Sequence, residues 1–326
     1  MIIHVSEEVT PRLRGEEFGR AHADQVLHTI EIYRRMCDLG AGGRVRASDD
    51  EHEELHGIAT GAGVSVKELL AVNARTELTS GRHECSVVGA GDVLAQNWDW
   101  HPDLQASTLL WIVRENGGWF ATLTEAGMLA KIGMNDAGLG VCLNILHTTA
   151  DGGLDGTPIH ILLRRTLATA KTVDDALEIL TAATTTASSA VTVATPNDVA
   201  SVELSPGGAN VIRGHVGAHT NHFLEPPPGG RDTYVDVSPT TLQRLETVRR
   251  APLLDALRSH DGHPKGVCRH VDANEAWVDQ SVTIASVVMN LEKRRLHVAD
   301  GPPCTRAHVE ITLPQPSTRL ASTATR

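Results

Sequence analysis

The sequence predicts a layered α+β domain in which two sheets of mainly antiparallel strands are sandwiched by helices. Apolar residues recur at helical spacing over 15–38 and 49–62. Short runs of β-prone residues separated by glycine-containing turns begin at residue 85, and a second strand run covers about 188–222 after two intervening helices. Helices and sheets each bury one apolar face, so this order of elements favours helical and sheet layers around one core.

The first part of the chain is mainly helical. A short edge strand is expected over 1–6, followed by helices over 15–38 and 49–62. Ser65 and Glu68 form a capping box that starts a third helix. The helical region therefore ends shortly before residue 85.

Strands dominate from residue 85 onward. Three successive hairpins, which predict an antiparallel sheet, are expected with strands over 85–89, 93–98, 107–114, 119–124, 130–134 and 139–146. The remaining expected elements are helices over about 158–170, 172–182 and 239–259 and strands within 188–222 and over about 282–290, 295–299 and 307–313. Residues 225–230 predict a surface loop, because prolines and glycines fit neither element.

Composition narrows the class of protein. The 326 residues are 41% hydrophobic, which supplies a sizeable core. A net charge of −11 without a basic stripe disfavours a nucleic-acid partner, and no apolar run reaches the ~18 residues of a membrane span. The N-terminus lacks the pattern of a secretory signal, so we expect a cytoplasmic protein. Its five scattered cysteines then read as reduced thiols.

Two histidine patterns raise the question of a metal. His52, Glu53 and His56 match the pattern of zinc peptidases, but only Glu68 or Glu77 could supply a third ligand, so a solvated helix edge is the better interpretation. A zinc hydrolase stays as an alternative.

The second pattern is formed by His215, His219 and His222. If 217–222 is a strand, the last two of these side chains point to opposite faces and cannot chelate together. We therefore expect no metal and no other cofactor.

The most informative stretch is Glu84-Cys85-Ser86 followed by a short strand that ends in Trp98-Asp99-Trp100. Such an order can place a thiol nucleophile and its polar support on adjacent strands. A lone cysteine on a strand is also often an inert buried thiol. The rest of the sequence has to distinguish these two interpretations.

Several further segments carry a family resemblance, and together they extend from about residue 50 to residue 304. They are 55–64, 73–77, 84–86, 96–99, 124–133, 219–222, 267–269 and 301–304. The chain resembles the acyl-coenzyme A:6-aminopenicillanic acid (isopenicillin N) acyltransferase family of N-terminal-nucleophile hydrolases, the peptidase C45-like group, which includes β-alanyl amide hydrolases.

The resemblance implies a four-layer αββα sandwich and a precursor that cuts its own chain. A single domain over 1–313 would become an α fragment, 1–84, and a β fragment, 85–313, which stay associated; 314–326 would be a disordered tail. Cleavage before Cys85 frees its α-amine, whose pKa near ~7.7–8.0 suits a base at neutral pH. One residue then provides both nucleophile and base.

The resemblance also implies roles for individual residues. Cys85 would be the nucleophile, Asp99 would orient the new amine, Asn221 would stabilise the oxyanion, and Arg269 would hold carboxylates or substrate. Ser86 is expected to assist processing together with Glu84 and Cys85. Residues expected to contact substrate are Trp98, Trp100, Glu125 and His219.

One residue departs from the family pattern. The fungal acyltransferase has glycine before the nucleophile, whereas this chain has Glu84, which lacks the backbone freedom that an N-to-S acyl shift favours. The expected activity is cleavage of a small N-acyl or peptide-like amide. The alternatives are transfer of the acyl group between an amide or thioester and an amine, and a non-catalytic binding protein. A homo-oligomer is compatible with the sequence.

Overall fold

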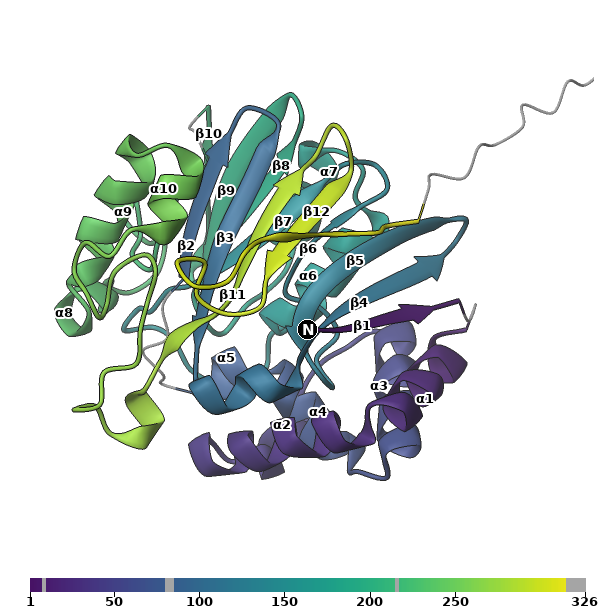
Figure 1. Ribbon diagram of the computed structural model, residues 1–326. Coiled ribbons are helices and arrows are strands. Elements are labelled where there is room, and N and C mark those ends of the chain that lie inside the picture. Colours follow the sequence, from purple (N-terminus) through teal and green to yellow (C-terminus); the bar gives the residue numbers. More distant parts are fainter. Residues whose placement is uncertain (8–9, 80–84, 215–216, 315–326) are drawn as a thin grey trace, which may run out of the picture.

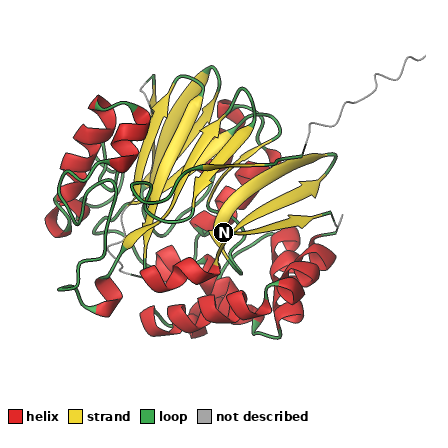
Figure 2. Ribbon diagram, viewed as in Figure 1, coloured by secondary structure: helices red, strands yellow, loops and turns green. Residues whose placement is uncertain are grey.

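Two face-to-face β-sheets form the centre of this computed structural model, which describes residues 1–7, 10–79, 85–214 and 217–314 (Figures 1 and 2). The larger sheet contains, in spatial order, β1 (Ile2–Ser6), β4 (Thr108–Glu115), β5 (Gly118–Glu125), β6 (Ile132–Asn135), β7 (Gly140–Ile145), β8 (Ser189–Thr195), β9 (Asp198–Ser205) and β10 (Gly208–Arg213). The smaller sheet contains β13 (Val309–Ile311), β12 (Arg295–Ala299), β11 (Val282–Asn290), β3 (Val93–Trp100) and β2 (Cys85–Ala90).

Helices cover the outer face of each sheet. On the larger sheet lie α6 (Ile159–Thr169) and α7 (Val173–Thr181), and beside the smaller sheet lie α8 (Tyr234–Val237), α9 (Thr240–Arg250) and α10 (Leu253–Arg258). The N-terminal helices close one end: α1 (Pro11–Ala21), α2 (Ala23–Met36), α3 (Asp49–Ala62), α4 (Val66–Asn73) and α5 (Arg75–Leu78) (Figure 1). The expected four-layer α+β sandwich is therefore confirmed.

The strand pairing is mainly antiparallel, as expected, and β1 with β4 is the parallel exception among the paired strands described. The three predicted hairpins do not form one sheet, so that prediction was wrong. β2 and β3 belong to the smaller sheet, and the 3₁₀ helix η2 (Pro102–Ser107) then leads into β4 of the larger sheet. β2, β3, β4 and β5 are each buried over most of their length, so the sequence carries no signal for the crossing from one sheet to the other.

Two predicted helices are each divided in two. The expected helix over 15–38 is interrupted at His22, between α1 and α2. The expected helix over 239–259 ends at Arg250, and α10 begins after Pro252, because proline lacks the N–H that would continue the helix. Residues 217–222 contain an isolated bridge between His219 and Val87 where a strand was expected. The expected tail, 314–326, lies outside the described residues from 315 on.

A buried ion-pair network joins the N-terminal helices to the rest of the domain. Glu54 of α3 accepts hydrogen bonds from Arg14 of α1 at 2.6 Å and from Arg164 of α6 at 3.1 Å. Glu115 of β4 binds Arg14 at 3.2 Å and Arg164 at 2.9 Å. Both arginines and Glu54 are buried, so each charge has a partner where solvent cannot supply one.

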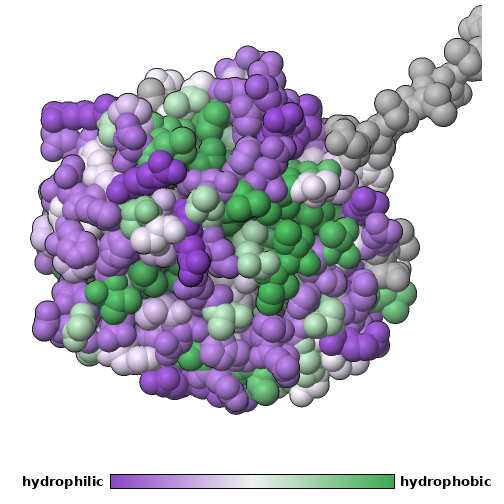
Figure 3. Space-filling model, viewed as in Figure 1, coloured by the Kyte–Doolittle hydropathy of each residue, from purple (hydrophilic) through white to green (hydrophobic). Residues whose placement is uncertain are grey.

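The surface is largely hydrophilic on the face that Figure 3 shows, with an apolar area near its centre. Within the described ranges, no helix has the length and apolar character needed to cross a membrane.

Candidate active site

Cys85 is the first residue of β2 and is 2% exposed. It pairs directly with Trp98 of β3, so both side chains lie on the same face of the smaller sheet. Gln96, two residues earlier on β3, shares this face and exchanges hydrogen bonds of 2.6 and 3.0 Å with the backbone of Leu143 on β7. The thiol therefore faces the interior between the two sheets.

Side chains from three other elements hold the backbone of Cys85. Its N–H donates to Oδ1 of Asn221 at 2.8 Å. Its carbonyl oxygen accepts from Nη1 of Arg244 at 2.8 Å and from Nδ2 of Asn144 at 2.9 Å. Both polar groups of this one peptide residue are thus paired with side chains in a buried setting, which fixes where its nitrogen and carbonyl lie.

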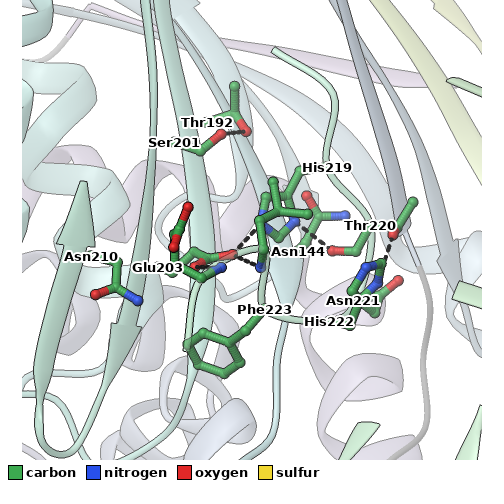
Figure 4. A network of polar contacts seen from close by, with 12 residues as sticks. Asn144, Thr192, Ser201, Glu203, Asn210, His219, Thr220, Asn221, His222 and Phe223 are labelled. Carbon is green, nitrogen blue, oxygen red and sulfur yellow. Dashed lines mark hydrogen bonds and ion pairs between the residues drawn. The ribbon is translucent and has the colours of Figure 1, made fainter. Parts of the chain in front are cut away.

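Asn221 reaches Cys85 because its segment is attached to β2 and β9. His219 and Val87 exchange backbone hydrogen bonds of 2.8 and 3.2 Å. The ring of His219 lies 3.0 Å from the Glu203 carboxylate and 2.7 Å from the Thr220 carbonyl oxygen (Figure 4). These two contacts hold the ring between the 219–222 segment and β9. The structure thus places His219 as a support for Asn221.

Arg244 is the central residue that the sequence analysis missed. Besides the Cys85 carbonyl, it donates to Oγ of Ser86 at 2.9 Å and to Oδ1 of Asn221 at 3.1 Å. Its signal was its position on α9, where Thr241, Arg244, Leu245 and Val248 form the buried face. An arginine at a core position of an amphipathic helix needs a polar partner there.

Asp99 and Arg269 are connected through Thr283 of β11. Oγ1 of Thr283 donates to Oδ1 of Asp99 at 2.6 Å and accepts the backbone N–H of Arg269 at 2.8 Å. All three residues are buried. The structure therefore brings Asn221 into direct contact with Cys85 and places the Asp99 carboxylate close enough to affect the Cys85 thiol. The main chain of Arg269 is linked to Asp99 through Thr283. Glu84 lies outside the described residues.

The environment keeps the Cys85 thiol protonated. Burial raises its pKa, Lys131 opposes the rise, and the Asp99 carboxylate adds to it. A thiol with a raised pKa is a poor nucleophile at neutral pH. Chemistry at Cys85 consequently requires a base.

A second buried cluster adjoins the thiol. Nζ of Lys131 lies 4.4 Å from the ring of Trp98 and 5.1 Å from that of Trp100. Burial, and secondly the charge of Arg75, lower the pKa of Lys131 to about 7. Glu125 opposes this shift and accepts a hydrogen bond from the hydroxyl of Tyr33 at 2.8 Å. Lys131 is thus an amine that changes its charge near neutral pH.

Several polar atoms of this cluster lack hydrogen-bond partners among the described residues. They comprise all three guanidinium nitrogens of Arg75 and Oε2 of Glu125. The guanidinium lies 3.7 Å from the Trp100 ring, and its Nε is 3.7 Å from Oε1 of Glu125. Buried donors without acceptors are costly, so this cluster suits a polar group that arrives with a ligand.

The zinc-peptidase pattern does not develop into a site. His52 and His56 lie on α3 with ring centroids 4.8 Å apart. Within the described part of the chain, the ligand-type side chains close enough to share a metal form a different group, and it contains neither histidine. The solvated helix edge remains the better interpretation of this pattern.

Comparison with known proteins identifies the family. The family model described as acyl-coenzyme A:6-aminopenicillanic acid acyl-transferase matches residues 88–303, about two thirds of the chain. The chain belongs to this family. The matched range contains Asp99, Asn221, Arg244 and Arg269, and it begins just after Cys85. The family predicted from the sequence is thereby confirmed, and with it an enzyme whose chemistry takes place at amide bonds.

A curated relative and two solved structures were also found. The 40 kDa form of the acyl-coenzyme A:6-aminopenicillanic-acid-acyltransferase of Emericella nidulans is 30% identical over 254 residues, covering 68% of this chain and 70% of the relative. Penicillin V acylase from Agrobacterium tumefaciens is 15% identical, covers 67% of this chain and 82% of its own, and has a TM-score of 0.47. A variant of the conjugated bile acid hydrolase from Clostridium perfringens is 12% identical, covers 69% and 92%, and has a TM-score of 0.49.

Proposed function

We propose that this acyltransferase-family protein is a cysteine amidohydrolase that cleaves its own chain before Cys85 and then hydrolyses a small N-acyl or peptide-like amide. The observation that supports it most is the anchoring of Cys85. Its N–H and its carbonyl are bound by Asn221, Arg244 and Asn144. An inert buried thiol would need no such anchoring of its own main chain, whereas a residue that becomes a catalytic N-terminus does.

The maturation step uses the thiol on the preceding peptide bond. Sγ of Cys85 attacks the carbonyl carbon of Glu84, and the C–N bond breaks as the nitrogen takes up a proton, which leaves a thioester and a free amine. Water then hydrolyses the thioester, giving a carboxylate at Glu84 and a thiol at Cys85. No external energy source is required, because the net reaction is hydrolysis of one peptide bond.

The mature site then supplies its own base. The α-amine of Cys85 takes the thiol proton, and the thiolate attacks the substrate carbonyl. The amine part of the substrate leaves with a proton, and water releases the acyl group from Sγ. Asn221 Oδ1 already contacts the nitrogen that becomes this amine. Its Nδ2, which would stabilise the oxyanion, donates to the Ile145 carbonyl at 2.9 Å in the continuous chain.

Acyl transfer to an amine is the alternative within the same chemistry, and the Emericella relative carries an acyltransferase name. Both reactions share the acyl-enzyme and differ in whether water or an amine removes the acyl group. The Arg75 nitrogens that lack hydrogen bonds among the described residues, together with the nearby amine of Lys131, support a substrate that carries a carboxylate or another anionic group next to the scissile amide.

The two fragments are proposed to stay associated after cleavage. The N-terminal fragment contributes β1 to the larger sheet, where it pairs with β4. It also supplies Arg14 and Glu54 to the buried network with Glu115 and Arg164. Separation would expose these charges and apolar helix faces.

All five cysteines are unpaired, which agrees with the predicted cytoplasmic location.

The first experiment measures the mass of freshly purified protein under denaturing conditions. We expect two fragments divided before Cys85, an uncut chain for Cys85→Ala, and normal cleavage for Cys142→Ala, which removes another buried thiol. Turnover is then measured on N-acyl amides, β-alanyl amides and penicillins, with and without an added amine to separate hydrolysis from transfer. An uncut chain that is active, or activity in Cys85→Ala, would refute the proposal. Loss of activity in His52→Ala would instead favour the zinc hydrolase.

A further inference from the structure

Four potential metal ligands from two loops meet on the outer side of the smaller sheet. They are His260, Cys268, His270 and Cys304, and their ligand atoms all lie within 4.8 Å of one another. The first three belong to the segment between α10 and β11, and Cys304 follows β12. The sequence analysis expected no metal and did not consider these four residues together.

The distances fit a tetrahedral ion. Nε2 of His270 lies 3.1 Å from Nε2 of His260, 3.5 Å from Sγ of Cys304 and 3.8 Å from Sγ of Cys268. Around tetrahedral zinc, with bonds of about 2.0–2.1 Å to nitrogen and 2.3 Å to sulfur, neighbouring donors stand roughly 3.3–3.8 Å apart. Small side-chain movements would centre an ion among the four.

Hydrogen bonding alone does not account for the arrangement. One imidazole nitrogen carries either one hydrogen or one lone pair. Nε2 of His270 nevertheless lies close to three other potential ligand atoms, the two sulfurs and Nε2 of His260. A disulfide between Cys268 and Cys304 would explain the two sulfurs and leave the two histidines unexplained. Both thiols are unpaired in the structure.

We propose that His260, Cys268, His270 and Cys304 bind one zinc ion with a structural role. Two thiolates and two imidazoles form a closed set that leaves no position for water or substrate. The ion fastens the segment before β11 to the turn after β12.

The location of this site gives it a role in positioning the active site. Cys268 directly precedes Arg269, whose N–H binds the same Thr283 hydroxyl that donates to Asp99. On its other side, the carbonyl of Val267 accepts from Asn97 of β3 at 2.8 Å. A zinc ion at Cys268 would therefore immobilise the segment that supports Asp99 through Thr283, without contacting the thiol of Cys85.

The test is metal analysis of the full chain after dialysis from a zinc-containing buffer. We expect about one zinc per chain in the wild type and less than a tenth of that in a Cys268→Ser, Cys304→Ser double variant. His263→Ala is the matched control, because its ring lies in the same loop, 6.0 Å from that of His260, yet outside the group of four. It should keep its zinc.

Two further readouts make the result independent of how well the double variant folds. Cobalt(II) added to the metal-free wild type should give the absorption of a tetrahedral thiolate site, which one equivalent of zinc abolishes. Thiol counting in denatured, unreduced protein should find all five cysteines. Wild type without stoichiometric zinc, a missing pair of thiols, or a double variant that retains zinc would each overturn the proposal.

Discussion

The side-chain oxygen of Asn221 lies 2.8 Å from the backbone nitrogen of Cys85 and accepts its N–H. The two halves of this amide can be tested separately. Asn221→Asp keeps the acceptor, whereas Asn221→Leu removes both the acceptor and the Nδ2 donor. We expect the Asp variant to cleave its chain and then to turn over about 10²–10³-fold more slowly, because an oxyanion donor is lost. The Leu variant should fail at both steps.

Single-turnover cleavage of the precursor and steady-state turnover on the identified amide provide the two measurements for Asn221. Full turnover by Asn221→Asp would show that its Nδ2 group is not the oxyanion donor. Cleavage of Asn221→Leu at the normal rate would show that its contact with the Cys85 nitrogen does not position the scissile bond.

Arg244→Met should destabilise the protein and slow its processing. The guanidinium binds the Cys85 carbonyl, Ser86 Oγ and Asn221 Oδ1, and methionine would leave these acceptors with fewer donors in a buried site. Unsatisfied buried groups cost about 1–3 kcal/mol each, so we expect a loss of a few kcal/mol in the free energy of unfolding. Urea unfolding and the rate of chain cleavage measure the two effects. Arg249→Met, on the exposed side of the same helix, should change neither.

Lys131→Met should change how stability depends on pH. The pKa of Lys131 is about 7 in the folded chain, against 10.5 without burial, so between these values the unfolded state binds more protons. The lysine therefore makes stability rise with pH across this window, by up to about 1.4 kcal/mol per pH unit. The stability advantage of the Met variant should be largest near pH 7 and shrink toward pH 10. Both chains, the one with Lys131 and the Lys131→Met variant, also carry the substitution Cys85→Ala, so that neither chain is cleaved.

Denaturant unfolding at several pH values between about 7 and 10 gives the difference between the two chains directly. A difference that stays constant over this range would mean that the buried amine titrates as it does in water, and that Lys131 is charged beside Cys85 at neutral pH.

The fold could largely be predicted because its elements obey local rules. The segments 282–290 and 295–299 are rich in β-prone residues and are separated by a short polar turn, and the structure places β11 and β12 on those residues. The division between α1 and α2 at His22 was not predictable, since neither proline nor glycine stands there. Pro252 did carry a signal for a helix break, and the prediction of one unbroken helix over 239–259 overlooked it.

The site was predictable only where it follows a motif. Cys85, Asp99 and Asn221 were named as candidates through segments that resemble a family. Arg244 and Asn144 were not, because they reach Cys85 from α9 and β7, and contacts between layers leave no local pattern. The four glycines at the contact of α1 with α3, Gly15, Gly19, Gly57 and Gly61, likewise had no interpretation until the packing of these helices was known.

Gly57→Ala should change the free energy of unfolding through two opposing effects. In an isolated helix, alanine is favoured over glycine by about 1 kcal/mol. Here an added Cβ would lie 2.2 Å from the Arg12 carbonyl oxygen and 2.8 Å from the Glu16 nitrogen, because α3 packs directly against the backbone of α1. Gly15 on α1 is in the same position, 2.1 Å from the Glu54 oxygen. Backbone atoms cannot rotate away, so the helices must separate.

Overpacking of this kind costs about 1–3 kcal/mol and sometimes more, and the separation would also stretch the Arg14–Glu54 ion pair between the same helices. We therefore expect Gly57→Ala to lower the free energy of unfolding by at least about 1 kcal/mol, despite its better helix propensity. Gly43→Ala is the control, because its Cβ would meet only the Lys67 side chain at 3.5 Å. If Gly57→Ala proved as stable as the wild type in urea, α1 and α3 could not be in backbone contact.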